Sequence, residues 1–184
     1  MARSTRSGLL THKHRTVEAN NTSKEITETF SHLDKRGKAT MVDVSEKTIS
    51  KRTAVARSIV HLPEEVMAQL TDGDLQTKKG SVFQIAVIAG IMAAKKTGEL
   101  IPLCHPLGLD NCHIDISVNE MNEVVIDCTA TITAKTGVEM EALVGASIGA
   151  LTIYDMCKAL SHDIVIKETK LMEKTGGKRD FKRA

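Results

Sequence analysis

The sequence has very few aromatic residues: its 184 residues include three Phe, one Tyr and no Trp. The core must therefore consist of aliphatic side chains and Met, and the lack of large anchors indicates that oligomer contacts help to bury apolar helices. The same lack argues against a nucleic-acid-binding module, the first alternative function, because such sheets stack bases on Phe or Tyr. A regulatory oligomer that binds a small ligand is the second alternative.

The sequence also lacks a membrane-length apolar run, an apolar segment near its N-terminus and the cysteine spacing of a secreted disulfide scaffold. We therefore expect a soluble protein without a membrane partner, and four Cys in apolar or strand-like surroundings indicate a reducing compartment. The predicted location is cytoplasmic. The first seventeen residues contain Arg, Ser and Thr but no acid, so the mitochondrial matrix is the alternative if they form a transit peptide.

Charge and hydropathy divide the chain near residue 40. Residues 1–40 hold eight Lys or Arg and four Asp or Glu, whereas the remainder holds seventeen and nineteen, so the net charges are +4 and −2. The first part is polar and has little hydrophobic periodicity, so we predict a mostly disordered N-terminal extension over residues 1–40. Residues 41–184 are long enough for one core and predict a single domain.

Hydrophobic periodicity predicts both strands and helices in this domain. The expected strands are 52–61, 113–119, 124–133 and 163–167, and the expected helices are 63–72, 81–96 and the segment from Gly137 onward. Ser81 is placed to cap the second helix. This order of elements predicts an α+β fold, a ferredoxin-like (β-α-β-β-α-β) antiparallel sheet with the helices on one face, in an oligomer.

The segment from Lys135 to Lys158 is the most informative, because it is apolar on nearly every side and has no Pro. Such a pattern is typical of a helix buried inside a protein, where charges need pairing or use. Its ionisable groups after Gly137 are Glu139, Glu141, Tyr154, Asp155, Cys157 and Lys158. The alternative is an ordinary helix with an exposed, acidic first turn and a surface pair between Asp155 and Lys158.

Two adjacent Cys-His pairs, Cys104-His105 and Cys112-His113, are candidates for metal or acid–base chemistry. Pro102 and Pro106 flank the first pair and hold its backbone extended, which suits a ligand, an acid or base, or a nucleophile. Zinc is an alternative, although adjacent Cys and His seldom face one ion and the spacing differs from structural zinc motifs. For Cys112-His113 we favour a buried Cys and a His at a strand start.

Basic residues gather at loop and terminal positions, namely Arg52, Lys78, Lys79, Lys135, Lys174 and Lys178. Lysines that precede helix N-termini add to the helix dipole and favour phosphate binding. Together with Glu139, Glu141 and Asp155, they predict an anionic substrate that is handled by acid–base chemistry.

Six segments resemble the cyclic pyranopterin monophosphate synthases, the MoaC family of molybdenum cofactor biosynthesis. They are MVDVSEK (41–47), KKGSVFQIAVIAGIMAAKKT (78–97), LIPLCHP (100–106), KTGVEMEAL (135–143), ALTIYDMCKAL (150–160) and KTGGK (174–178). The resemblance covers residues 30–182 and is most specific in LCHP, KTGVEMEAL and LTIYDMCK. It implies that residues 41–184 are a catalytic ferredoxin-like domain.

The resemblance implies a phosphorus–oxygen lyase that converts 3′,8-cyclo-7,8-dihydroguanosine 5′-triphosphate into cyclic pyranopterin monophosphate and releases pyrophosphate. It also implies a homohexamer, a trimer of dimers with active sites at the dimer interface, and a functional link to a radical-SAM GTP cyclase. It implies no required metal, and we expect no redox cofactor. The scarcity of aromatics argues against a nucleic-acid partner. The family's catalytic positions fall on Asp155, Lys79 and Lys158, and its substrate-binding positions on Arg52, Leu103, Cys104, His105, Glu139, Met140, Glu141 and Lys174.

Helix geometry constrains how these residues meet. Glu141 and Asp155 are fourteen residues apart, so one continuous helix places them on nearly the same face but about 21 Å apart along its axis. Carboxylates at that separation cannot both touch one reacting atom. Either the helix breaks near Gly145 or Gly149, or its two ends serve different parts of a site that a neighbouring subunit completes.

Overall fold

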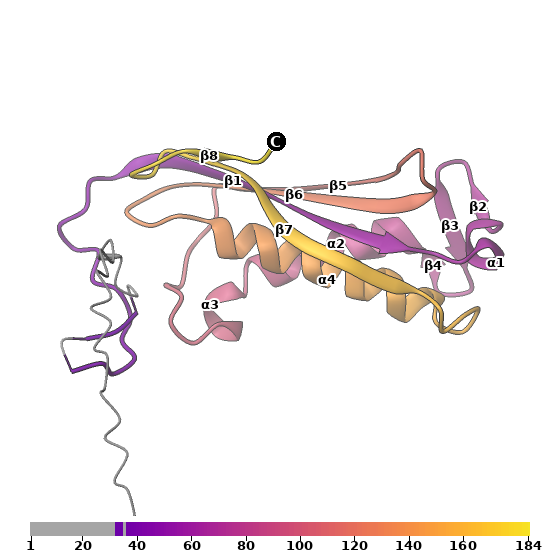
Figure 1. Ribbon diagram of the computed structural model, residues 1–184, viewed down its shortest axis with the longest axis horizontal. Coiled ribbons are helices and arrows are strands. Elements are labelled where there is room, and N and C mark those ends of the chain that lie inside the picture. The colour runs from indigo at the N-terminus through magenta and orange to yellow at the C-terminus, as the bar shows by residue number, and fades with distance from the viewer. Residues whose placement is uncertain (1–31, 35) are drawn as a thin grey trace, which may run out of the picture. The chain divides into compact units, whose positions relative to one another are not determined.

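The computed structural model describes residues 32–34 and 36–184, and a five-stranded antiparallel sheet organises them. The strand order is β5-β6-β1-β7-β8, with bounds β1 Ser50–His61, β5 Asn111–Val118, β6 Glu123–Ala134, β7 Val165–Thr175 and β8 Phe181–Lys182. Two long helices, α2 (Val82–Ala94) and α4 (Glu139–Cys157), lie side by side on one face of the sheet (Figure 1). The prediction of an α+β fold with an antiparallel sheet is confirmed.

Most of the predicted disordered extension, and all of the candidate transit peptide, lie outside the described residues. The described part of the extension, residues 32–34 and 36–40, forms a turn. The side chain of Asp34 accepts hydrogen bonds from the backbone N of Arg36 and Lys38 at 2.8 and 2.9 Å, and Leu33 and Ala39 form a β-bridge. This part of the chain is therefore tied by local hydrogen bonds.

The central strands alternate as their sequences predict. On β6, the buried row is Val124, Ile126, Cys128, Ala130 and Ile132, and each of these residues is at most 5% exposed. On β1, which pairs with β6 along its whole length, the buried row is Ala54, Ala56, Ser58 and Val60. Each buried Val or Ile adds about 1.5–3 kcal/mol of hydrophobic stabilisation, so these rows anchor the two helices to the sheet.

Small residues allow α2 and α4 to approach each other closely. A Cβ atom added at Gly90 of α2 would lie 2.7 Å from the carbonyl oxygen of Gly145 on α4, so the helices touch at backbone distance. Ser81 caps α2 as predicted, since its Oγ accepts a hydrogen bond from the backbone N of Gln84 at 3.2 Å. The close contact fixes the position of α4 on the sheet.

The expected helix over residues 63–72 is wrong beyond its first turn. The helix α1 spans only Glu64–Met67, and a small three-stranded sheet follows, made of β2 (Leu70–Thr71), β3 (Asp74–Thr77) and β4 (Gly80–Ser81). Asp72 and Gly73 both have positive φ, 52° and 80°, which is the backbone of a tight hairpin turn. The chain also adds a short helix, α3 (Thr97–Leu100), after α2.

The helix α4 is continuous from Glu139 to Cys157, with no break at Gly145 or Gly149. By length and composition alone it could cross a membrane, so the expectation that no segment approaches that length is wrong. Half of its apolar window is buried, in contact with α2 and with strands of the sheet, as for the core helix of a folded domain. Because α4 is continuous, Glu141 and Asp155 lie near opposite ends of the same helix.

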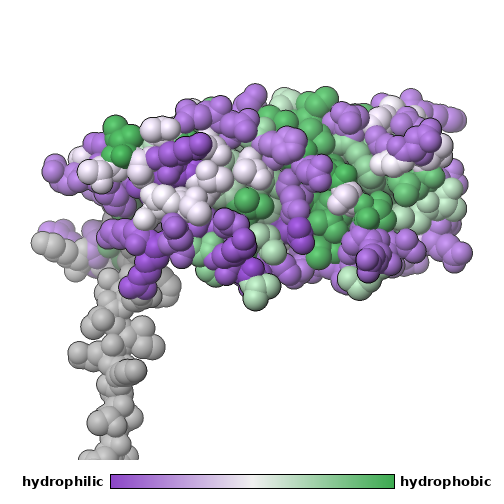
Figure 2. Space-filling model, turned by 90° about the horizontal axis from the view of Figure 1, so that it is seen from above, coloured by the Kyte–Doolittle hydropathy of each residue, from purple (hydrophilic) through white to green (hydrophobic). Residues whose placement is uncertain are grey.

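α2 and α4 cover one face of the sheet, and no helix of the described chain covers the opposite face (Figure 1). Seen from above, hydrophilic side chains surround groups of apolar ones on this surface (Figure 2). The half-buried side chains of Val55 and Ile59 alternate along β1 with Arg57, whose guanidinium donates two hydrogen bonds to Asp127 at 2.6 and 2.8 Å. The face is therefore mixed in polarity.

Candidate functional site

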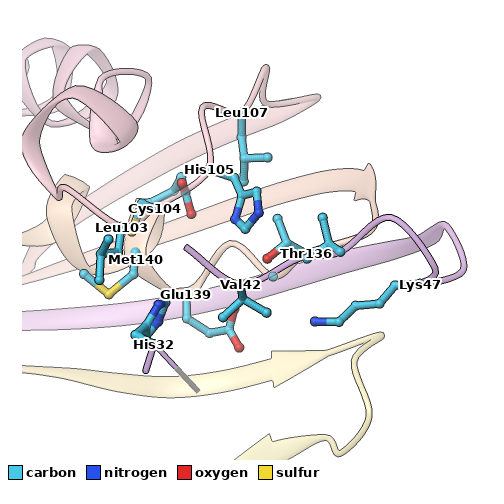
Figure 3. Close-up of a pocket in the computed structure, with 13 residues that line it drawn as sticks. His32, Val42, Lys47, Leu103, Cys104, His105, Leu107, Thr136, Glu139 and Met140 are labelled. Atoms are coloured by element: carbon cyan, nitrogen blue, oxygen red, sulfur yellow. The ribbon is translucent and has the colours of Figure 1, made fainter. Parts of the chain in front are cut away.

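A cavity of about 300 Å³ lies at the N-terminal end of α4 (Figure 3). Three segments form it: the chain before β1, the loop after α3, and the turn that leads into α4. It is lined by six of the predicted substrate-binding residues, Leu103, Cys104, His105, Glu139, Met140 and Glu141. The structure thus brings together residues of two separate motifs, such as His105 and Glu139, which are 34 positions apart in the sequence.

Glu141 is a buried carboxyl group in this cavity. Only 3% of the residue is exposed, so the alternative of an exposed, acidic first turn is wrong for Glu141. Burial raises the pKa of Glu141, and the neighbouring charge of Glu139 raises it further. Glu141 therefore holds a proton more tightly than a free glutamate, which suits a group that gives or takes protons near neutral pH.

Glu139 connects the cavity to the sheet. Its Oε1 accepts a hydrogen bond from Lys174 Nζ of β7 at 3.1 Å, and its carboxylate folds back over Gly137, where a Cβ atom would collide with it. Arg52 lines a small recess together with Glu139 and Lys174, and its Nε donates to the carbonyl oxygen of Ala134 at 3.0 Å. Arg52 and Lys174, which belong to strands of the sheet, therefore lie next to Glu139 of the cavity.

The Cys104-His105 pair lies on the loop after α3, and the His105 ring points into the cavity (Figure 3). Burial raises the pKa of the Cys104 thiol, and the charge of Glu141 raises it further. A neutral thiol is a poor nucleophile, so Cys104 is suited to contact a substrate rather than to attack it. His105 is the group of this pair that is suited to proton transfer.

The chain before β1 supplies cavity residues that the sequence did not indicate: His32, Val42, Val44 and Lys47. Lys135 Nζ donates a hydrogen bond to the carbonyl oxygen of Ser45 at 2.5 Å and so ties this chain to the turn before α4. Lys47 is the cation among the described lining residues, and its side chain extends along the cavity opening (Figure 3). Val42, Val44 and Lys47 belong to the motif MVDVSEK, which carries the resemblance but has no hydrophobic periodicity, whereas His32 lies outside that motif.

The three predicted catalytic residues form a second group at the other end of α4. Lys158 Nζ donates to Asp155 Oδ1 at 2.7 Å, and both side chains are open to solvent, 50% and 57% exposed. The hydrogen bond from Lys158 lowers the pKa of Asp155, and the positive charge of Lys79 on the β3–β4 turn lowers it further. The same hydrogen bond raises the pKa of Lys158. Within one chain, Asp155 and Lys158 therefore form a surface i,i+3 ion pair, which is the alternative that the sequence also allowed.

The described chain, residues 32–34 and 36–184, contains no group of three or more His, Cys, Asp or Glu that could hold a metal ion. Cys104, Cys112, Cys128 and Cys157 are all free thiols. In this part of the chain, neither Cys-His pair therefore belongs to a set of ligands that could bind zinc. The chemistry available at the site is that of carboxyl, imidazole, thiol, ammonium and guanidinium groups.

The raised pKa of Glu141 predicts a pH-dependent stability. Because the folded protein binds this proton more tightly than the unfolded chain does, the contribution is fully present below the ordinary glutamate pKa of about 4.3. It is lost as the pH rises through the raised pKa. We expect the variant Glu141→Gln to lose less thermal stability than the wild type between pH 4.5 and 7.5, measured as Tm by calorimetry.

The matched control for this measurement is Glu120→Gln, because Glu120 is exposed and has no hydrogen bond or ion pair to another residue in the described part of the chain. Its Tm should follow that of the wild type at every pH. Parallel Tm curves for Glu141→Gln and the wild type would contradict the assignment of a raised pKa to Glu141.

The chain matches the MoaC family over residues 41–177. A cyclic pyranopterin monophosphate synthase from Xanthomonas campestris pv. campestris (strain B100) is 52% identical over 165 residues, 90% of this chain and 98% of that protein. Molybdenum cofactor biosynthesis protein 1 of Dictyostelium discoideum is 51% identical over 166 residues, 81% of this chain and 26% of that protein. A molybdenum cofactor biosynthesis bifunctional protein of Synechocystis sp. is 50% identical over 155 residues, 82% of this chain and 45% of that protein. The chain belongs to the MoaC family.

Proposed function

We propose that the chain is a cyclic pyranopterin monophosphate synthase, a lyase of molybdenum cofactor biosynthesis. It converts 3′,8-cyclo-7,8-dihydroguanosine 5′-triphosphate into cyclic pyranopterin monophosphate and pyrophosphate. The observation that carries this proposal is the cavity at the N-terminal end of α4, where the residues of LCHP and KTGVEMEAL meet around the buried carboxyl of Glu141. A relative that is 52% identical over 98% of its own length bears this name.

The charges of the two groups fit the two ends of this substrate. Glu139 and Glu141 present carboxyl oxygens in a concave cavity, and such oxygens accept hydrogen bonds from the N–H groups along the edge of a guanine or pterin ring. Lys79 and Lys158 present ammonium groups at the exposed end of α4, which suits the triphosphate. We therefore place the ring at the cavity and the phosphates at the lysines.

Two chemical steps follow from this placement. The aminal of the cyclised purine opens and the pterin ring closes, which requires proton transfers, and His105 and Glu141 are the cavity groups suited to them. A sugar hydroxyl then attacks the α-phosphorus, its proton passes to a carboxylate, and the bond to the leaving pyrophosphate breaks. Asp155 is the carboxylate beside Lys79 and Lys158, whose charges offset the negative charge that develops on the phosphate oxygens.

We further propose that the domain is ferredoxin-like and that it assembles as a homohexamer, a trimer of dimers, with each site shared by two subunits. The order β5-β6-β1-β7, with α2 and α4 on one face, supports the first part. Exposed apolar side chains on the helices support the second, since Ile88 and Met92 of α2 and Leu151 of α4 are 58%, 55% and 52% exposed. Asp155 and Lys158 are 57% and 50% exposed, so this end of α4 is open to contact with a second chain.

The remaining proposals concern the cellular setting. We place the protein in the cytoplasm, or in the mitochondrial matrix if residues 1–17 are a transit peptide. The four free thiols are compatible with either reducing compartment. The substrate is a cyclised GTP, so its supplier is a GTP cyclase, and we propose the radical-SAM enzyme that the family resemblance implies. No nucleic acid or membrane partner is proposed.

The direct test is incubation of the purified protein with the cyclised GTP substrate. We expect one pyrophosphate for each pterin product, with pyrophosphate measured by a coupled enzymatic assay and the pterin by fluorescence after oxidation. A protein that releases neither product would contradict the proposal. Release of pyrophosphate without a pterin would contradict the proposed ring chemistry. The protein would then act only as a phosphohydrolase.

A further inference from the structure

Strands β5 and β6 carry two thiols that face each other outside the candidate site. Cys112 Sγ and Cys128 Sγ lie 3.9 Å apart, and neither residue lines the cavity. Cys112 is paired with Ala130 and Cys128 with Ile114, so the two cysteines are diagonal neighbours on adjacent antiparallel strands. The function proposed above uses neither thiol.

The two thiols differ in access. Cys112 is half-buried and belongs to β5, the edge strand of the sheet, whereas Cys128 is fully buried. Cys128 Sγ occupies the space beside Gly145 of α4, where an added Cβ atom would lie 2.5 Å from the sulfur. A reagent from solvent therefore reaches Cys112 first, because Cys128 has no exposed surface.

The two thiols also differ in acidity. The hydrogen bond with Cys128 lowers the pKa of Cys112, and the positive charge of Lys95 lowers it further. The pKa of Cys128 is raised by the same hydrogen bond and by burial. Because the thiolate is the reactive form of cysteine, Cys112 is the attacking group and Cys128 the resolving group.

We propose that Cys112 and Cys128 are an oxidisable dithiol that closes to a cross-strand disulfide when the protein meets a small-molecule disulfide such as oxidised glutathione. The Cys112 thiolate attacks one sulfur of the oxidant, forms a mixed disulfide and releases one glutathione thiolate. Cys128 loses its proton and attacks the Cys112 sulfur, which breaks the mixed disulfide and releases the second glutathione. Two cysteine thiols are oxidised, one disulfide is reduced, and the two protons end on two glutathione thiols.

Closure requires a shift of the edge strand, because diagonal neighbours on antiparallel strands lie about 7–8 Å apart, whereas disulfides usually join Cα atoms about 4.4–6.8 Å apart. The sulfur atoms must move together from 3.9 Å to the disulfide bond length of about 2.05 Å. Cys112 lies on an edge strand, which has a neighbouring strand on one side only, so it can shift more readily than Cys128. In a reducing compartment the dithiol is the resting form, and the disulfide reports an oxidising challenge.

The test uses the full chain with and without equilibration in excess oxidised glutathione, followed by unfolding and digestion with a glutamate-specific protease. Cleavage after Glu120 and Glu123 separates the two cysteines, so a disulfide joins peptide 100–120 to peptide 124–139. We expect this cross-linked mass in the oxidised wild type and its loss on reduction. We also expect the titre of free thiols in the unfolded protein to fall from four to two.

The matched variants are Cys112→Ser and Cys104→Ser, because both residues lie in peptide 100–120 and both are partly exposed. Cys104→Ser should keep the cross-link, and Cys112→Ser should lose it. A wild type that keeps four free thiols would overturn the proposal. A cross-link that survives in Cys112→Ser and disappears in Cys104→Ser would overturn it as well, because the disulfide would then be formed by Cys104.

Discussion

Replacing Asp155 by Ala is expected to lower kcat for pterin formation by about 100- to 10,000-fold. Asp155 is hydrogen-bonded to Lys158 and feels the charge of Lys79. In the proposed phosphate step it accepts the hydroxyl proton, and Ala cannot replace it in that role. The side chain is 57% exposed in the single chain, so its removal leaves the core intact. The measurement is kcat and KM from steady-state release of pyrophosphate, together with Tm.

The matched control is Asp163→Ala, because Asp163 is an exposed aspartate just beyond the same end of α4. We expect it to retain kcat within about twofold of the wild type, as surface substitutions away from a site usually do. The Tm of both variants should stay close to that of the wild type. If Asp155→Ala keeps most of its activity, the surface pair with Lys158 has no catalytic role and the proposed phosphate step is wrong.

The sheet and its buried rows could be predicted from the sequence because the pattern there is local. Residues 126–133 alternate between apolar and polar, and the structure buries Ile126, Cys128, Ala130 and Ile132 as that period requires. The small hairpin after α1 was missed although Asp72-Gly73 is a strong turn signal. Pro63 and the two glutamates after it indicated a helix, and its length was overestimated.

The candidate site could be predicted only in part because its geometry is set by contacts between distant segments. The motifs around Cys104 and Glu141 identified six of the thirteen residues that line the cavity, but the segment that supplies His32, Val42, Val44 and Lys47 gave no periodic signal. That segment is held by a hydrogen bond between Lys135 and Ser45, which are 90 residues apart. A sequence pattern carries no information about such a contact.

The continuity of α4 removes one of the two alternatives that helix geometry left open, namely a break in the helix. With no break at Gly145 or Gly149, Glu141 and Asp155 remain at opposite ends of one straight helix, about 21 Å apart. One substrate cannot engage both ends of the same helix through a single reacting centre. We therefore infer that each site combines the cavity of one chain with the Asp155 group of another.

A site shared between subunits is tested most directly by mixing two inactive proteins, Glu141→Ala and Asp155→Ala, under conditions that exchange subunits. If each site takes Glu141 from one chain and Asp155 from its neighbour, every mixed dimer contains one intact site and one doubly altered site. Random mixing in equal amounts should then restore roughly a quarter of the wild-type activity. Pyrophosphate release is the readout, and mass spectrometry of a tagged chain confirms that mixed oligomers have formed.

The control mixture combines Glu141→Ala with Glu139→Ala, because both residues belong to the same end of α4 and every site in a mixed dimer is then defective. This mixture should show no more activity than its two components. Recovery in the first mixture and none in the second is the predicted result. No recovery in the first mixture, with mixed oligomers demonstrated, would contradict a site that is shared between subunits.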